Sequence, residues 1–127
     1  MLTTRRADGH LVSRPMATQK RSPGADFWFA TMEDLAKVRE IGGDPRINLS
    51  YYKDRTREWV SISGEAEISR DRGKIRELWA PDWKIWFSDE GGRKAGSADD
   101  PRIVLICVHA RSAQYMTVDK PQHMVLF

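Results

Sequence analysis

The sequence has a single cysteine, Cys107, in 127 residues, and this scarcity excludes an internal disulfide. Cys107 stands in an apolar run, where we expect it to be a small buried hydrophobic side chain. No apolar stretch approaches the roughly 18 residues of a membrane-spanning helix, and the first residues do not resemble a signal peptide. These absences predict a protein of the reducing cytoplasm that does not act in a membrane.

Positive charge is in small excess only. The 21 basic and 18 acidic residues give a net charge of +3, and the two signs are interspersed along the chain. The densest basic cluster, between Arg70 and Arg76, is interrupted by Asp71. Such a pattern is typical of a solvated helix face, so we expect no nucleic-acid partner, and an RNA-binding barrel is the weaker alternative.

Histidines are few and scattered. His10 falls in an expected turn, His109 at an expected strand end and His123 in the C-terminal tail. No two of them have the spacing of metal ligands, so the sequence predicts no metal site.

Alternating and continuous apolar runs predict more strands than helices. The expected strands span residues 1–5, 11–17, 27–30, 46–52, 58–69, 101–110 and 112–118. The last two are expected to form a hairpin, and the expected helices begin at Thr31, at Ser69 or Asp71, and at Asp82. We therefore expect a mainly β, α+β protein: an antiparallel barrel with two or three appended helices. Residues 1–118 should form one domain, followed by a tail at 119–127.

Two glycines carry a specific structural expectation. Asp8-Gly9 lies between the first two expected strands and is a strong signal for a hairpin turn. Gly64 lies inside the long strand 58–69 and indicates a bulge or bend there.

The segment from Ser13 to Lys37 carries the clearest chemical signal. Thr31 is expected to be the N-cap of a helix, with Asp34 as the reciprocal acid of a capping box. A helix N-terminus favours an anion such as a phosphate, and Arg14 and Lys37 are cations that would complete such a site. The alternative is an ordinary cap flanked by two solvated bases.

Several motifs in order resemble one known family. They are Ser13-Arg14-Pro15-Met16, Phe27-Trp28-Phe29-Ala30-Thr31, Lys37-Val38, Asp44-Pro45-Arg46-Ile47-Asn48-Leu49-Ser50-Tyr51 and the run from Trp59 through Gly64. Their order and spacing resemble the pyridoxamine 5′-phosphate oxidase-like group, in particular its general stress protein 26 branch. The resemblance covers about residues 1–116.

This resemblance implies an FMN-binding split barrel that forms a homodimer, with the flavin at the subunit interface; FAD is the alternative cofactor. By analogy, Arg14 and the backbone through Gln19 line the flavin, while Thr31 and Lys37 hold its phosphate. One of Trp79, Trp83 and Trp86 would cover the flavin ring across the interface, and packing in the core or at the interface is the alternative for each tryptophan. The full set of expected flavin-binding positions is Arg14, Pro15, Met16, Gln19, Ala30, Thr31, Lys37, Trp59 and Trp86.

The chain departs from the family pattern at two positions. Family enzymes that oxidise pyridoxamine phosphate often carry a lysine where Gln19 falls and an arginine where Ala36 falls. We therefore expect no efficient pyridoxamine 5′-phosphate oxidase activity. Two functions remain open: a flavin-dependent oxidoreductase of unknown substrate, and a flavin-binding stress protein that acts as a carrier or sensor without turnover.

Overall fold

The structure, a computed structural model, describes residues 1–87, 92–119 and 123–126. The strands are β1 (Leu2–Arg5), β2 (Leu11–Arg14), β3 (Phe27–Met32), β4 (Arg46–Tyr52), β5 (Trp59–Ser69), β6 (Ile103–Met116) and β7 (His123–Leu126). The helices are α1 (Ala36–Gly43), α2 (Arg72–Leu78) and α3 (Trp83–Trp86), with a short 3₁₀ turn at Gly92–Lys94.

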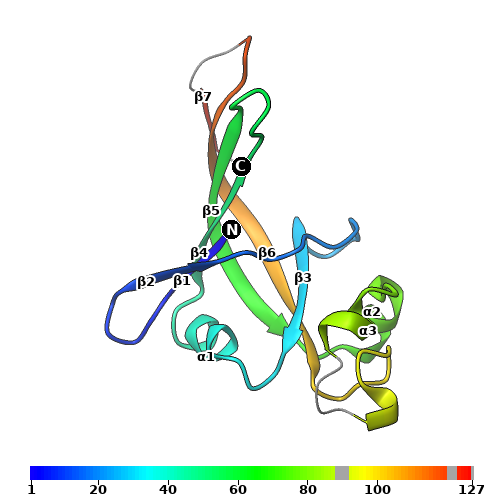
Figure 1. Cartoon of the computed structure of the whole chain (residues 1–127). Coiled ribbons are helices and arrows are strands. Elements are labelled where there is room, and N and C mark those ends of the chain that lie inside the picture. The colour runs from blue at the N-terminus through cyan, green and yellow to red at the C-terminus, as the bar shows by residue number, and fades with distance from the viewer. Residues whose placement is uncertain (88–91, 120–122, 127) are drawn as a thin grey trace.

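The strands form one curled antiparallel sheet (Figure 1). Its order is β2-β1-β4-β5-β6-β3, and β7 pairs with β6 outside this path. Helix α1 lies below β1 and β4, while α2 and α3 lie together beyond β3 and the lower end of β6 (Figure 1). The expected antiparallel, barrel-like sheet with appended helices is confirmed.

Strand β6 is the centre of the fold because both of its faces are buried. Ile106 and Val108 belong to a core that includes Ile41 of α1, whereas Leu105 and Cys107 belong to a second core that includes α2 and α3. A strand buried on both faces needs apolar residues at successive positions, which explains the continuous apolar run. The expectation that Cys107 is buried is confirmed, and burial raises the pKa of its thiol to about 11.

The bulge expected at Gly64 is present. The register between β5 and β6 shifts between Ser63 and Gly64, which pair with Ser112 and Ala110, so the extra residue of the bulge is Arg111 of β6. A Cβ on Gly64 would lie 2.1 Å from the carbonyl oxygen of His109, so no larger residue fits without moving the backbone. The bulge lets one long strand follow the curl of the sheet.

The first hairpin forms where the sequence predicts it. Strand β1 pairs with β2 from Leu2↔Arg14 to Arg5↔Leu11, with the turn at Asp8-Gly9 between them. Gly9 has a φ of 88°, which glycine adopts without strain. The hairpin places Arg14 at the end of β2, opposite the start of β1.

The predicted cap of the first helix is wrong. Thr31 lies in β3, where it pairs with Val104, and α1 begins at Ala36 after Leu35 at the N-cap position. Thr31 and Asp34 both precede the N-cap position, and Leu35 at that position makes no side-chain capping hydrogen bond. Thr31 is buried and continues the pairing with β6, so the strand extends into the Thr-Met-Glu-Asp sequence that resembles the start of a helix. The second expected cap is confirmed, since the Asp71 side chain accepts from two backbone N–H groups of α2.

The predicted hairpin between residues 101–110 and 112–118 is also wrong. Strand β6 continues through Ser112 to Met116, and its partner along this length is β5, as in Met116↔Trp59. Strand β5 is 11 residues long, and β6 pairs with it along its whole length. Within the C-terminal tail, β7 pairs with β6 from Ser112 to Tyr115. Residues 120–122 and 127 of the tail, and residues 88–91, lie outside the described residues.

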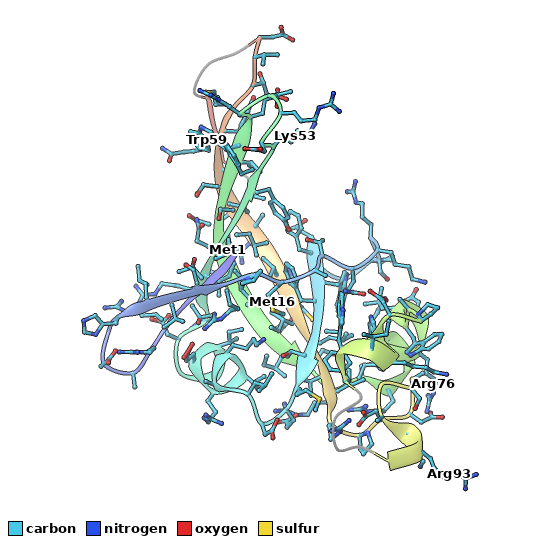
Figure 2. The ribbon with its side chains drawn as sticks, viewed as in Figure 1. Met1, Met16, Lys53, Trp59, Arg76 and Arg93 are labelled. Carbon is cyan, nitrogen blue, oxygen red and sulfur yellow. The ribbon has the colours of Figure 1, made fainter. Side chains whose placement is uncertain are left out.

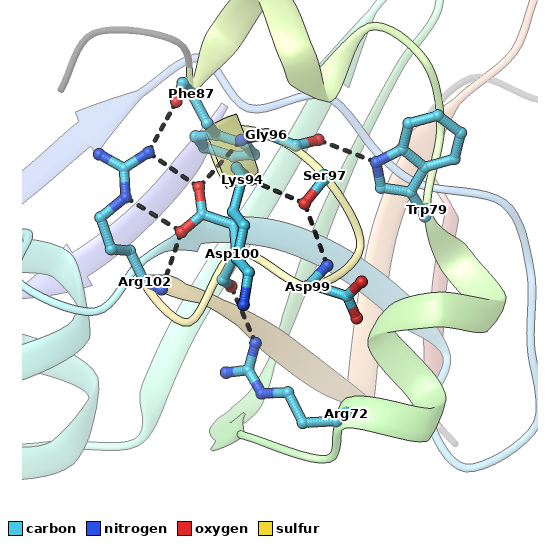
Figure 3. A network of polar contacts seen from close by, with 9 residues as sticks. All are labelled: Arg72, Trp79, Phe87, Lys94, Gly96, Ser97, Asp99, Asp100 and Arg102. Carbon is cyan, nitrogen blue, oxygen red and sulfur yellow. Dashed lines mark hydrogen bonds and ion pairs between the residues drawn. The ribbon is translucent and has the colours of Figure 1, made fainter. Parts of the chain in front are cut away.

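A buried carboxylate closes the loop before β6 (Figure 3). Asp100 accepts hydrogen bonds from the Gly96 N–H (2.9 Å) and from the guanidinium of Arg102 (2.8 and 3.0 Å). Arg72 of α2 donates to the Asp100 carbonyl (3.0 Å), and the indole of Trp79 donates to the Gly96 carbonyl (2.8 Å). This network joins α2 to the loop that leads into β6.

The upper ends of β4, β5 and β6 project beyond the rest of the sheet (Figure 1). Trp59 and Lys53 lie on this projection, far from the helices (Figure 2). Tyr52 and Val118 on the same projection are 61% and 67% exposed. None of the helices in the described part of the chain has the length and hydropathy to cross a membrane.

Candidate functional site

Arg14 is held at the end of β2 by three hydrogen bonds. Its guanidinium donates to the Thr4 hydroxyl at 2.7 Å, to the Glu40 carboxylate at 3.1 Å and to the Leu2 carbonyl at 3.4 Å. The Thr4 hydroxyl in turn donates to the same Glu40 oxygen at 2.6 Å. Arg14 therefore joins β1, β2 and α1.

Lys37 lies in the first turn of α1 and is half-buried. Its ammonium donates to the sulfur of Met16 at 3.4 Å, and no carboxylate of the described residues forms an ion pair with it. Burial and the nearby charge of Arg14 lower the pKa of Lys37. We call the group of Arg14, Met16 and Lys37 the Arg14–Lys37 site. It presents two cations side by side, and a thioether is a weak acceptor for one of them.

Thr31 adds an unpartnered hydroxyl. The residue is 1% exposed, and its Oγ1 is buried without a hydrogen-bond partner among the described residues. Only the short turn from Met32 to Leu35 separates Thr31 from α1, and the Leu35 N–H donates back to the Met32 carbonyl. A buried hydroxyl without a partner costs free energy unless a ligand or a water satisfies it.

The segment after Arg14 is extended, and its side chains diverge. Pro15 is exposed, Met16 packs against the core that contains Ile41, and Ala30 is buried in β3. Gln19 is fixed on both ends of its amide, which accepts from the Trp83 indole at 3.0 Å and donates to the Ala17 carbonyl at 3.0 Å.

A large cavity opens beside this segment. Its volume is about 790 Å³, and it is lined by Thr18, Gln19, Lys20, Arg21, Asp26, Phe27, Trp28, Tyr51, Val60, Ile62, Ala110, Ala113 and Tyr115. Phe27 and Tyr51 stack within it with ring centroids 6.2 Å apart, and Thr18 hydrogen-bonds to the Tyr51 hydroxyl at 2.6 Å. A cavity of this size with aromatic walls and a few polar groups suits a small planar molecule.

Two of the expected flavin-binding residues do not reach the Arg14–Lys37 site within one chain. Trp59 lies on the projecting end of the sheet, whereas Met16 lies near its middle (Figure 2). Trp86 lies on α3 and is 48% exposed (Figure 1). Helix α3 nevertheless contacts Gln19, through the indole of Trp83.

Sequence reasoning missed two residues that contact Arg14. Thr4 and Glu40 stand 10 residues before and 26 residues after Arg14 in the sequence. Glu40 reads as an ordinary charged position on a helix, and Thr4 as an ordinary strand residue. The pairing of β1 with β2 and the packing of α1 bring them together, and no local motif signals this.

Metal chemistry has no candidate donor set in the part of the chain that the structure describes. No three histidine, cysteine or acidic side chains of these residues lie close enough to hold a metal ion. His109 is half-buried and contacts Glu67 at 3.3 Å on the sheet surface.

Comparison with known proteins decides the family. The sequence profile described as "Pyridoxamine 5′-phosphate oxidase like" matches residues 1–127. The chain belongs to the pyridoxamine 5′-phosphate oxidase-like family. The resemblance drawn from the motifs is thereby confirmed, and with it the split-barrel class of the fold.

A curated relative is Protein bli-3 of Neurospora crassa, which is 38% identical over 118 residues. The match covers 91% of this chain but only 56% of that protein, so the chain spans little more than half the length of this family member.

Solved structures of this family share the fold. A Clostridium acetobutylicum protein related to general stress protein 26 is 20% identical, with a TM-score of 0.81 over 100% of this chain and 84% of that one. A pyridoxamine 5′-phosphate oxidase-related, FMN-binding protein of Nostoc punctiforme is 16% identical, with a TM-score of 0.76 over 97% of this chain and 77% of that one. At these identities the similarity establishes the architecture.

Proposed function

We propose that this family member binds FMN at the Arg14–Lys37 site and acts as a flavin-dependent oxidoreductase of the general stress protein 26 type. The observation that carries the proposal is the half-buried ammonium of Lys37, whose acceptor is the sulfur of Met16. A half-buried cation with so weak an acceptor beside a second cation is suited to an anionic ligand.

The groups around Lys37 fit a phosphate. A dianion would offset the burial and the charge of Arg14 that lower the pKa of Lys37. The unpartnered Thr31 hydroxyl would supply a further donor. Helix α1, which has no side-chain cap at Leu35, would direct its free N–H groups toward the same charge.

The flavin ring would lie along the segment from Met16 to Gln19, toward the aromatic cavity. Gln19 lines that cavity and is fixed by Trp83, so its amide is oriented before any ligand arrives. FAD, with its larger nucleotide, is the alternative cofactor for the same set of contacts.

A bound flavin would supply the redox chemistry, since it accepts and passes on electrons. The chain's own residues would bind the phosphate, orient the ring through Gln19 and exclude water with Phe27 and Tyr51. The carboxylate at the site, Glu40, is already engaged with Arg14 and Thr4. A general acid or base must be free to exchange a proton with the substrate. The engagement of Glu40 therefore favours the second candidate, a flavin-binding carrier or sensor.

We further propose that the functional unit is a homodimer. Trp59 lies on the projecting end of the sheet, away from Met16 in one chain, so it would reach a flavin at the Arg14–Lys37 site from a second copy (Figure 2). The proposed unit is a cytoplasmic protein with no nucleic-acid partner.

Efficient oxidation of pyridoxamine 5′-phosphate is not part of the proposal. That substrate brings a second phosphate, and the two positions where family oxidases often carry cations are Gln19 and Ala36 here. Lys20 and Arg21 are nearby but exposed, and fixing their long side chains would cost conformational entropy. We expect turnover of this substrate well below about 1 s⁻¹, the lower end of ordinary enzymic rates.

The binding proposal is tested by titrating the purified apoprotein with FMN and with riboflavin while following flavin fluorescence. FMN should bind in the micromolar range or tighter, and riboflavin, which lacks the phosphate, about tenfold or more weakly. Lys37→Ala should weaken FMN and leave riboflavin nearly unchanged. Lys94→Ala, which removes an exposed ammonium on the 3₁₀ turn, is the matched control. Equal affinities for the two flavins would refute the phosphate site.

Turnover separates the two candidate functions. The FMN-loaded protein is mixed with reduced nicotinamide, and its oxidation is followed by absorbance. Steady oxidation supports an oxidoreductase, whereas tight FMN binding without turnover of this or other reductants supports a carrier or sensor.

A further inference from the structure

Three side chains from three different elements meet around the guanidinium of Arg14. Thr4 comes from β1, Arg14 from β2 and Glu40 from α1. The Thr4 hydroxyl accepts from Arg14 at 2.7 Å and donates to Glu40 Oε1 at 2.6 Å, and that same oxygen accepts from Arg14 at 3.1 Å. The three contacts form a closed triangle, which we call the Thr4–Arg14–Glu40 triangle.

The triangle is largely removed from water. The Thr4 residue is 1% exposed, and the Arg14 and Glu40 side chains are 19% and 12% exposed. The exposed ion pair between Arg70 and Glu33 has side-chain exposures of 58% and 43%. A partly desolvated ion pair with a bridging hydroxyl holds its geometry more firmly than an exposed pair.

The contacts of Arg14 leave part of the guanidinium available. The group has five N–H donors, and its hydrogen bonds to Leu2, Thr4 and Glu40 use Nη1 and Nη2. Nε and the second Nη2 proton have no acceptor among the described residues. The triangle therefore fixes the plane of the guanidinium while leaving two donors for a ligand.

We propose that Glu40 and Thr4 are positioning residues that hold Arg14 in place for the flavin. This inference rests on the proposed function, because it needs a flavin at the Arg14–Lys37 site. Glu40 also offsets the charge of Arg14, which leaves Lys37 as the cation without a carboxylate partner in the described part of the chain. Glu40 and Thr4 act through Arg14 and do not touch the ligand themselves.

A purely structural ion pair makes a different prediction. In that case the loss of Glu40 lowers the stability of the hairpin and α1, but the folded variant binds flavin as the wild type does. A third reading treats Glu40 only as a negative charge near the phosphate, and its removal would then tighten FMN binding whether or not Arg14 is present.

A double-mutant cycle separates these readings. FMN affinity is measured by fluorescence for the wild type, Glu40→Ala, Arg14→Ala and the double variant, at a temperature where circular dichroism shows each protein folded. Glu40→Ala and Arg14→Ala should each weaken FMN by about tenfold, as expected for a lost charge-assisted contact. The double variant should be no weaker than Arg14→Ala, because Glu40 acts only through Arg14.

Conservative variants and a control complete the test. Glu40→Gln keeps an oxygen acceptor for Thr4 and Arg14, so its FMN affinity should stay within about threefold of the wild type. Glu33→Ala removes the carboxylate of the exposed pair with Arg70 and should have no effect. Where Glu40→Ala does not fold, Thr4→Val takes its place in the same cycle, since it removes the bridging hydroxyl at nearly constant shape.

The outcomes distinguish the two proposals. Wild-type affinity in folded Glu40→Ala, or a further loss when Glu40→Ala is added to Arg14→Ala, would overturn the positioning role. Tighter binding in Glu40→Ala would overturn it in favour of the simple charge effect. A wild-type protein that binds no FMN would instead overturn the proposed function.

Discussion

The indole N–H of Trp83 donates a 3.0 Å hydrogen bond to the side-chain oxygen of Gln19, 64 residues away in the sequence. The backbone N–H of Gln19 also donates to the Trp28 carbonyl of β3 at 2.9 Å. The bond thus connects the segment that follows Arg14 to the buried residue of α3.

A second contact ties the same segment to α2. The Lys74 ammonium lies 2.8 Å from the Ser22 hydroxyl, 2.6 Å from the Glu77 carboxylate and 5.2 Å from the ring centroid of Trp28. The Trp28 indole donates to the Ser22 carbonyl at 2.9 Å. Helix α3 therefore supports Gln19, at the end of the segment along which we propose that the flavin lies, and α2 supports the loop that follows it.

Trp83→Phe should destabilise the protein by about 2 to 3 kcal/mol. The change leaves the Gln19 oxygen without its donor, for about 1 kcal/mol, and opens a cavity in a fully buried position, for a further amount of similar size. Trp86→Phe is the control, since Trp86 is 48% exposed, and it should change stability by less than about 0.5 kcal/mol. Urea denaturation measures both, and equal losses would contradict the role given to the Trp83 bond.

Gly96→Ala should be among the most damaging single substitutions. Gly96 has a φ of 72°, and a Cβ there would lie 2.5 Å from the Trp83 carbonyl oxygen and from the Lys84 Cα. Backbone atoms cannot rotate away, so we expect a loss of about 2 kcal/mol or more. Gly42→Ala in α1 is the matched control, with no atom within 4 Å of the new Cβ. It should leave stability unchanged or raise it by up to about 1 kcal/mol, and thermal unfolding of the two variants compares them.

Sequence patterns predicted the elements that local signals define. Asp8-Gly9 located the first hairpin, Gly64 located the bulge, and the candidate caps Ser69 and Asp71 located the start of α2, where Asp71 is the cap. In each case a few neighbouring residues determine the backbone conformation, so the pattern and the structure agree.

The sequence patterns failed where contacts between residues far apart in the sequence determine the local structure. Thr31 has the local sequence of an N-cap, but its pairing with Val104 in β6 keeps it in a strand. Ser112 looks like the start of a new strand, but its pairing with Ser63 continues the old one. The contacts of Arg14 with Glu40 depend on how α1 packs, which no local motif encodes.

The homodimer stays a prediction that sedimentation can test. Tyr52 and Val118 expose large apolar surface on the projecting end of the sheet, and Trp59 lies beside them, half-buried. A two-fold dimer that covers this surface should bury more than roughly 1,200 Å² in total, as stable interfaces do. At micromolar concentration we expect about twice the chain mass of 14.6 kDa. A single species of the chain mass would refute the dimer and leave the proposed flavin site without Trp59.

Acid should weaken the fold through Asp100. Burial opposes ionisation of this carboxyl, but the hydrogen bonds from Arg102 and from the Gly96 N–H outweigh it and hold its pKa at about 2, below the ordinary 3.8. Because the folded-state pKa is lower than the unfolded one, the ionised carboxylate stabilises the fold above about pH 4. This contribution, on the order of 2 kcal/mol, declines as the pH falls from about 4 toward 2.

Asp100→Asn isolates this contribution. The variant should be less stable than the wild type by about 2 kcal/mol at pH 7, and the difference should shrink steadily between about pH 4 and 2.5, as measured by urea denaturation at each pH. Asp99→Asn is the control, because Asp99 is 64% exposed and pairs with Arg76 at 3.5 Å, a contact worth little in water. Its stability should follow that of the wild type at every pH. A difference between wild type and Asp100→Asn that stays constant down to pH 2.5 would show that the carboxylate's charge does not carry the stabilisation, and that only the shape of the network around Gly96 and Arg102 matters.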